Sequence, residues 1–260
     1  MRRILYVDGF NFYYGVTVYW RAQRNLAGLG WCDFSALIRR HFPVHGRLRI
    51  KYFTAPVTQN VEKRNNPGEH KRYSTWIRAL RTIDSLTVVE GFYKKEFRDN
   101  PDAPVKLREE KQTDVNLAIE MVMDAWGAPG STPDHVYVLS DDCDLMPAIF
   151  ALQERLPARV EVSVLLPSQA NVEIWRDTYE RTIRVLRKCH SIGTSQGRPG
   201  RPMEVAILDE HLLASSLLGY VLRDSAGEFS CPPYWRLPSE YLSQHCRKSD
   251  WRPDLPPQQR

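Results

Sequence analysis

"RILYVDGFNFYYG", residues 3–15, joins an apolar run to a single acid and then to a cluster of aromatic side chains. Residues 3–7 have the length and composition of a buried strand. Asp8 ends that strand, and Asn11 follows three residues later. A carboxylate at the end of a buried strand costs free energy unless it is paired, hydrogen-bonded or bound to a cation. Asp8 is therefore the first candidate for a functional residue.

Beyond this stretch, runs of strand character alternate with segments of helical periodicity. Strands are predicted over residues 3–7, 48–53, 86–93, 135–140 and 160–166. Helices are predicted over residues 33–42, 69–83, 113–126, 143–156 and 172–186. This alternation predicts an α/β fold with a doubly wound, mainly parallel sheet and helices on both faces. In such a sheet, ligands bind beyond the carboxyl ends of the strands.

The composition is that of an ordinary globular protein, with 42% hydrophobic and 26% charged residues and a net charge of +5. No apolar run approaches the roughly 20 residues that cross a bilayer, and the run before Asp8 is too short for a signal-peptide core. The five cysteines form no C-x-x-C pair, so reduced thiols are expected. These features predict a cytoplasmic protein without a membrane partner.

The alternating pattern ends near residue 186, which suggests a division of the chain. We predict a domain over residues 1–190, followed by a Gly/Pro/Arg linker at 191–202, "SIGTSQGRPGRP". Residues 203–250 form a C-terminal extension of unknown role, and residues 251–260 have the composition of a disordered tail. The extension, with "LLASSLLGYVL" as a candidate helix, either packs on the main domain or binds a partner. Packing is the favoured alternative.

Further acids occur where the sheet edge should lie. Asp142 and Asp144 follow the fourth predicted strand in "LSDDCD", and the ends of parallel strands meet at one edge. Asp114 falls on the core-facing stripe of the helix predicted over 113–126, with Thr113 as its N-cap. The alternative for Asp114 is a first-turn aspartate that only interacts with the helix dipole.

Four carboxylates at one edge repel one another unless a divalent cation neutralises them. Carboxylate oxygens suit Mg²⁺ or Mn²⁺, which leave positions open for phosphate oxygens. The sequence has neither a G-x-G-x-x-G dinucleotide fingerprint nor a P-loop, and no serine lies in a G-x-S-x-G setting. The acids therefore favour a magnesium-dependent phosphoryl or phosphodiester centre with one or two metal ions.

Three segments together resemble a known family. "YVDGFNFYYG" (6–15), "KQTDVNLAIEMVMDAW" (111–126) and "VYVLSDDCDLMPAI" (136–149) are similar to the three motifs of bacterial NYN domains of the LabA-like type, relatives of the PIN-domain nucleases. The resemblance covers about residues 1–187. It implies a PIN-like fold and a metal-dependent ribonuclease, specifically an endoribonuclease. The catalytic and metal-binding residues it implies are Asp8, Asp114, Asp142 and Asp144.

The resemblance also implies roles on the substrate side. Asn11 would steady Asp8 or a water, Ser140 would hydrogen-bond within its turn, and Lys111 would neutralise the scissile phosphate. A basic stretch over residues 94–111 would hold single-stranded RNA by its backbone, or is simply a solvated loop. The candidates in that stretch, besides Lys111, are Lys94, Lys95 and Arg108.

Several questions stay open on the sequence alone. The aromatics Phe10, Phe12, Tyr13 and Tyr14 either stack on unpaired bases or pack in the core. Asp141 stands where the family usually has glycine, and Cys143 where it has serine, which leaves the number of metal ions open.

Other functions and assemblies also remain as alternatives. The protein could be an RNA-binding or regulatory module with little catalysis. Some members of the family are described as pyridine-compound hydroxylases, a reaction that would need NADH, and this alternative ranks below the others because the chain shows no nicotinamide fingerprint. The oligomeric state is open, with a homodimer as one alternative.

Overall fold

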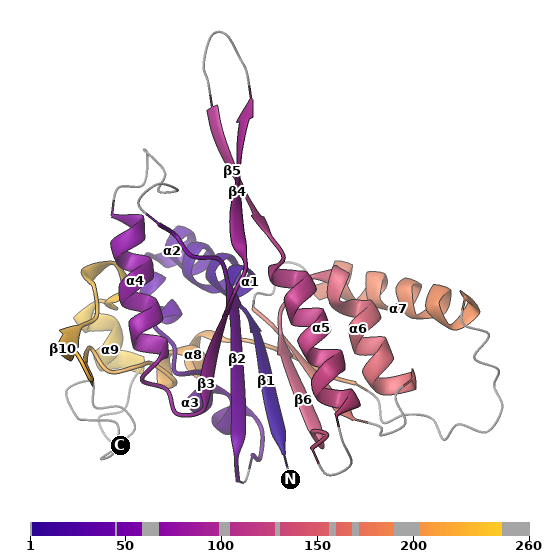
Figure 1. Cartoon of the computed structure of the whole chain (residues 1–260). Coiled ribbons are helices and arrows are strands. Elements are labelled where there is room, and N and C mark those ends of the chain that lie inside the picture. Colours follow the sequence, from indigo (N-terminus) through magenta and orange to yellow (C-terminus); the bar gives the residue numbers. More distant parts are fainter. Residues whose placement is uncertain are drawn as a thin grey trace.

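A six-stranded sheet forms the centre of the molecule (Figure 1). The computed structural model describes residues 2–44, 46–58, 68–98, 105–127, 131–155, 160–167, 172–189 and 203–245. All neighbouring strands of the sheet are parallel, and their order is β3-β2-β1-β6-β7-β8. The strands are β1 (Arg3–Asp8), β2 (Leu48–Thr54), β3 (Leu86–Glu90), β6 (His135–Leu139), β7 (Glu161–Leu166) and β8 (Glu204–Ile207). If only the strands of this sheet are counted along the chain, their order is 3-2-1-4-5-6, which is the order of a doubly wound sheet. The predicted fold class is therefore confirmed.

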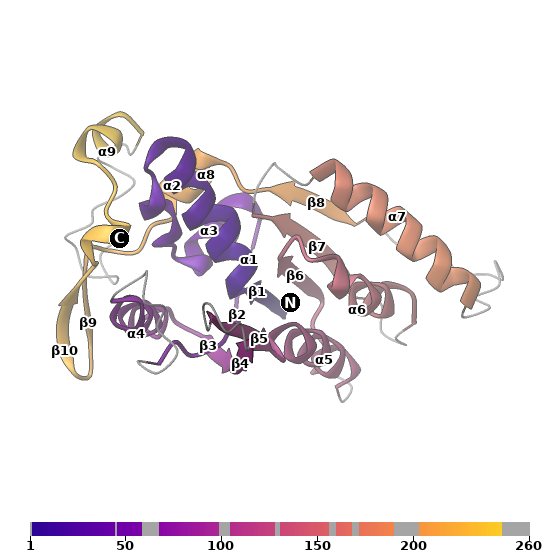
Figure 2. The same cartoon turned by 90° about the horizontal axis from the view of Figure 1, so that it is seen from above.

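Helices cover both faces of the sheet (Figure 2). On one face lie α1 (Gly9–Phe12), α2 (Tyr19–Arg24), α3 (Phe34–His41), α4 (Glu69–Leu80) and α8 (Glu210–Ser215). On the other lie α5 (Thr113–Trp126), α6 (Met146–Phe150) and α7 (Val172–Cys189). Successive residues of β1 point to opposite faces, so Leu5 and Val7 enter one core cluster while Ile4 and Tyr6 enter the other. The apolar run of β1 therefore supports both layers.

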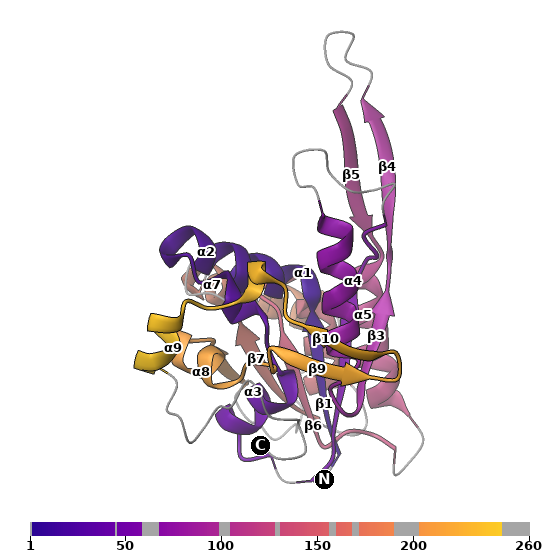
Figure 3. The ribbon, with the colours of Figure 1, turned by 90° about the vertical axis from the view of Figure 1, so that its left-hand side faces the viewer.

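The run predicted as one strand over residues 86–93 is divided at Gly91. Its backbone N–H donates to Thr54 O at 2.8 Å, the last bond to the central sheet. From there β4 (Phe92–Arg98) pairs antiparallel with β5 (Val105–Lys111) and forms a hairpin that rises from the carboxyl edge of the sheet (Figures 1 and 3). A Cβ on Gly91 would lie 2.6 Å from Lys111 O, so glycine permits this close crossing. A change of strand partner leaves no mark on apolar periodicity, which is why the prediction was wrong here.

The predicted helix over residues 143–156 is made of three short pieces. A 3-10 turn at Cys143–Leu145 leads into α6, and a π-helical turn follows at Ala151–Arg155. Pro147 sits in the first turn of α6, where its missing N–H is tolerated. The helical character of the segment was predicted correctly, but its continuity was not.

The C-terminal extension is part of the main fold. Its first element, β8, pairs with β7 as the sixth strand, and Leu208 N–H donates to Leu166 O at 2.9 Å. Trp235 and Leu237 are buried in the same core cluster as Leu5. Residues of the extension therefore pack on the domain that precedes it, which is the favoured alternative.

The later part of the extension differs from the predicted single helix. Only the first residues of "LLASSLLGYVL" belong to α8, and the last ones begin a hairpin of β9 (Val221–Asp224) and β10 (Gly227–Ser230). A 3-10 turn (Pro233–Trp235) and α9 (Ser239–His245) follow. The predicted linker at 191–202 and the tail at 251–260 lie outside the described residues. Within the described part of the chain, no helix has the length and apolarity to cross a membrane.

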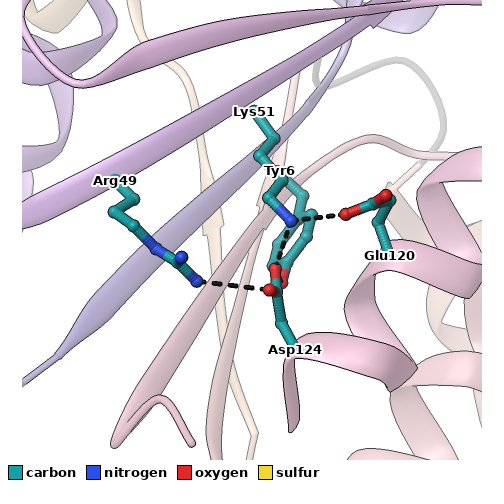
Figure 4. A network of polar contacts seen from close by, with 5 residues as sticks. All are labelled: Tyr6, Arg49, Lys51, Glu120 and Asp124. Carbon is teal, nitrogen blue, oxygen red and sulfur yellow. Dashed lines mark hydrogen bonds and ion pairs between the residues drawn. The ribbon is translucent and has the colours of Figure 1, made fainter. Parts of the chain in front are cut away.

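A polar network ties α5 to the strands beneath it (Figure 4). Lys51 Nζ of β2 lies 2.5 Å from both Asp124 Oδ2 and Glu120 Oε2. The Tyr6 hydroxyl donates to Asp124 Oδ2 at 2.6 Å, and Arg49 lies 3.3 Å from Oδ1. Burial opposes the charge of Asp124, but Lys51, Tyr6 and Arg49 outweigh it and lower the pKa of this carboxyl. The network fixes the C-terminal half of α5, and so the position of the helix that carries Asp114 at its other end.

Candidate metal centre

The candidate site lies where the order of the sheet reverses. Strands β1 and β6 are neighbours, and the chain leaves them toward opposite edges of the sheet. Asp8 closes β1, and Ser140 follows β6 directly. Doubly wound sheets bind ligands in the crevice at this switch point.

Asp8 is fully buried and begins α1 as its N-cap. Its Oδ1 accepts from the backbone N–H groups of Phe10 (3.1 Å) and Asn11 (3.0 Å). Its Oδ2 accepts from Asn11 Nδ2 at 2.6 Å and from Ser140 Oγ at 2.9 Å. The predicted contact between Asn11 and Asp8 is therefore present, and the orientation of the carboxylate is fixed by four donors.

These donors do not fully offset the cost of burying the charge. Burial raises the pKa of Asp8, its hydrogen bonds to Asn11 and Ser140 lower it, and the nearby charge of Asp142 raises it again, with a net rise. A nearby cation would therefore stabilise the ionised form of Asp8 more than it would stabilise that of an ordinary, exposed N-cap aspartate.

Ser140 links the ends of the two strands. Its hydroxyl donates to Asp8 and accepts from the backbone N–H of Asp142 at 3.0 Å. Asp142 in turn accepts from the backbone N–H of Asp144 at 2.8 Å. The hydrogen bond from Asp142 to Ser140 lies within the turn, as predicted, and the bond from Ser140 to Asp8 joins this turn to the end of β1.

Asp114 lies half-buried in the first turn of α5. Burial, followed by the charges of Asp8 and Asp142 and then of Glu110 and Asp144, raises the pKa of Asp114 to about 7. The predicted capping by Thr113 is wrong, because Thr113 is already helical and its backbone N–H donates to the Glu110 side chain at 2.9 Å. Glu110, which the sequence analysis missed, sits three residues earlier at the end of a strand rather than in a recognisable capping pattern.

Three of the four predicted acids come together. Oxygen atoms of Asp8, Asp114 and Asp142 lie within 4.8 Å of one another, from three separate elements. Asp144 is exposed and lies outside this group, so its side chain adds nearby charge rather than a ligand atom. Mg²⁺ sites use few carboxylates and keep water positions, and the pKa values of Asp8 and Asp114 are both raised, so the three acids fit such an ion.

The predicted cationic residues belong to the β4-β5 hairpin, which rises from the carboxyl edge of the sheet (Figure 1). Lys111 ends β5 one turn before Asp114 and is half-buried, whereas Lys94 of β4 is exposed. Lys95 and Arg108 are partners in the hairpin register, but their side chains lie outside what the structure describes. Lys111 therefore lies three residues before Asp114 in the chain, and Lys94 pairs with Glu109, two register positions farther along the hairpin.

The aromatics after Asp8 divide between the core and the wall of a pocket. Phe12 is buried against Phe34, with ring centroids 4.8 Å apart, and belongs to the core. Tyr14 is 56% exposed, and Phe10 packs edge-on against Tyr93 of the hairpin. Phe10, Tyr13 and Tyr14 line a pocket that also involves α4 and the C-terminal extension. The residues of α4 and of the C-terminal extension are far from Asp8 in the sequence, so no local pattern predicts that they line the same pocket.

Fold and site together define a doubly wound α/β protein with a three-carboxylate cluster at its switch point. No family model matches the chain. Over 198 residues it is 30% identical to 6-hydroxy-3-succinoylpyridine 3-monooxygenase of Pseudomonas putida, a match that spans 63% of this chain and 59% of that relative. A solved structure of a protein of unknown function from Vibrio parahaemolyticus covers 80% of this chain and 93% of its own, with 15% identity and a TM-score of 0.43.

Proposed function

We propose that the protein is a metal-dependent ribonuclease that hydrolyses phosphodiester bonds of single-stranded RNA at Asp8, Asp114 and Asp142. The observation that carries this proposal is the convergence of three carboxylates within 4.8 Å at the switch point of the sheet. Together they favour a divalent cation such as Mg²⁺ or Mn²⁺. The resemblance of the three motifs to NYN domains supports the same reaction.

The residues of the chain have distinct parts in this reaction. A bound divalent cation would supply Lewis acidity and lower the pKa of a water. Asn11 and Ser140 keep Asp8 oriented, so little reorganisation accompanies the reaction. Burial and the charge of Asp8 raise the pKa of Asp114 to about 7 without a cation, so the ionised form of this carboxyl would be stabilised by the ion that it helps to hold. Lys111 adds positive charge where the phosphate would lie.

The hairpin offers a second contact to the RNA strand. It stands on the same edge of the sheet as the acids, and its exposed Lys94 can pair with a phosphate (Figure 3). Contacts of this kind bind nucleic acid without regard to sequence and weaken as salt rises.

The test is cleavage of a labelled single-stranded RNA in Mg²⁺, compared with EDTA. Asp8→Asn and Asp142→Asn keep an oxygen for the backbone donors but remove a charge, so we expect at least about 100-fold slower cleavage. Asp177→Asn, at a side chain 74% exposed on α7, is the matched control and should cleave normally. Equal cleavage by all four proteins would identify a contaminant and sink the proposal. Tight RNA binding without Mg²⁺-dependent cleavage would instead favour an RNA-binding module.

A second candidate function comes from the relative in Pseudomonas putida, whose name describes a monooxygenase acting on a succinoylpyridine. The identity of 30% over 198 residues favours testing that reaction here. The measurement is aerobic consumption of NADH with 6-hydroxy-3-succinoylpyridine, with product analysis. Consumption coupled to a hydroxylated product would place this function above the first.

A further inference from the structure

Beside the three carboxylates lies a pocket walled by aromatic rings. Its cavity volume is about 90 Å³, and its mouth is open to solvent. Its walls come from α1 and the turn after it, from α4, from the hairpin and from the C-terminal extension. The rings that define this aromatic pocket are Phe10, Tyr14, Tyr73, Tyr93, Tyr234 and Trp235.

The pocket and the carboxylates share a wall. Gly9 and Phe10 line the pocket and directly follow Asp8, and the backbone N–H of Phe10 donates to the Asp8 carboxylate. A Cβ on Gly9 would lie 2.7 Å from the ring of Tyr52, another lining residue, so glycine lets the start of α1 lie directly on that ring. A ring bound in the pocket would therefore lie next to the carboxylate cluster.

Polar groups lie among the rings. The hydroxyls of Tyr13 and Tyr234 are 3.3 Å apart, and the Arg72 guanidinium lies 5.3 Å from the Tyr234 ring centroid. Arg21 also lies over this ring, at 5.0 Å. Flat apolar faces combined with hydroxyl and guanidinium donors match a planar heteroaromatic ring, which stacks through its face and hydrogen-bonds through its edge.

We propose that the aromatic pocket takes one unpaired nucleobase of the RNA strand and thereby sets the neighbouring phosphate at the three carboxylates. This inference rests on the proposed ribonuclease function and specifies its substrate as unpaired RNA, because a base held in a duplex could not enter. It also gives the C-terminal extension a role, since Tyr234 and Trp235 complete the wall.

The test measures binding of a short single-stranded RNA and of a series in which each nucleotide in turn lacks its base. The full chain is used, with Ca²⁺ replacing Mg²⁺ to suppress cleavage. We expect one abasic position to lower affinity about ten-fold and the others to have little effect. Tyr14→Ala removes an exposed ring with little risk to folding, and it should lower the affinity for intact RNA about as much as the abasic change does. It should not lower the affinity for the sensitive abasic RNA any further, because the two changes remove the same contact between ring and base.

Trp126→Ala is the matched control, since its ring is 65% exposed at the far end of α5 and lies outside the pocket. It should bind intact RNA normally and still lose affinity when the base at the sensitive position is absent. The pocket inference fails if every abasic RNA binds normally, or if the affinity losses from Tyr14→Ala and from the abasic change add. If cleavage still depends on the acids in that case, the proposed ribonuclease function stands.

Absence of RNA binding and cleavage would overturn the proposed function itself. Nicotinate, a free pyridine carboxylate, distinguishes the remaining use of the pocket. Suppose that the protein does not bind RNA, and that nicotinate quenches the tryptophan fluorescence of wild type but not of Tyr14→Ala. The pocket then binds a small pyridine compound, and the inference is overturned.

Discussion

At the scale of single residues, Asp114 differs from the other acids of the site. Asp8 and Asp142 both accept backbone N–H bonds at the start of a helical turn. Asp33 does the same for α3, accepting from Ser35 and Ala36 at 2.9 and 3.0 Å, and belongs to no such cluster among the described residues. Capping alone therefore explains an aspartate at such a position. Asp114 is the informative residue, because it is not an N-cap, and burial and the neighbouring acids oppose its charge.

The pKa of Asp114 predicts how stability depends on pH. Burial and the charge of Asp8 raise this pKa from 3.8 to about 7 in the folded state, so the folded form binds more protons than the unfolded form between these values. Without metal, the free energy of unfolding should therefore fall as pH rises from about 4 to about 7. Asp114→Asn should make this fall smaller and stabilise the metal-free protein at pH 8 by about 1 kcal/mol, after allowing for solvent screening. The raised pKa of Asp8 contributes the part of the fall that remains.

Urea unfolding at a series of pH values checks this, with Asp177→Asn as the control. Added Mn²⁺ should stabilise wild type more at pH 8 than at pH 6, because the ion competes with the proton. If the stability of wild type and that of Asp114→Asn depend on pH in the same way between pH 4 and pH 7, the assignment is contradicted.

At the scale of elements, two features of α5 matter for the site. Its boundaries, Thr113–Trp126, are those predicted from apolar periodicity, and the same periodicity placed Asp114 on the inward side. Its placement depends on Lys51, which reaches it from β2. No sequence pattern connects a lysine in a strand to Glu120 and Asp124, because the contact exists only when the helix lies over that strand.

Lys51→Met tests this anchoring. The change leaves Asp124 and Glu120 without their shared cation, and Asp124 is only 18% exposed, so we expect a loss of about 3 kcal/mol in the free energy of unfolding. Tyr6→Phe, which removes one hydrogen bond to the same carboxylate, should cost only about 1 kcal/mol. Chemical denaturation measures both. Equal and negligible losses would show that apolar packing alone positions α5.

At the scale of the whole molecule, the C-terminal extension completes both the sheet and the pocket. Trp235 stacks against Trp31, with ring centroids 5.5 Å apart, and lies 5.7 Å from Trp76. The hairpin β9-β10 is fastened to α4, where Arg78 Nε lies 2.5 Å from Asp224 Oδ2. Residues more than 150 positions apart thus share one core, and the extension is integral to the domain.

Trp235→Ala should therefore destabilise the entire domain. Removal of a large buried ring from this cluster should lower the free energy of unfolding by about 3–5 kcal/mol in a single transition. Tyr241→Ala, at a residue only partly buried against the same core, is the milder comparison. Urea unfolding followed by circular dichroism measures both. An unchanged midpoint for Trp235→Ala would show that the extension is dispensable for folding.

By itself, the sequence determined the doubly wound sheet and the edge at which Asp8, Asp114 and Asp142 meet, because period-2 and period-3.6 apolar patterns are local and parallel strands end on one side. Only the tertiary structure decided that Asp144 stays outside the cluster, that the chain leaves the sheet at Gly91, and that the extension supplies β8 and Trp235. These features depend on which surfaces meet after the chain has folded. Such contacts between distant segments are set by packing and burial, which a local pattern does not encode.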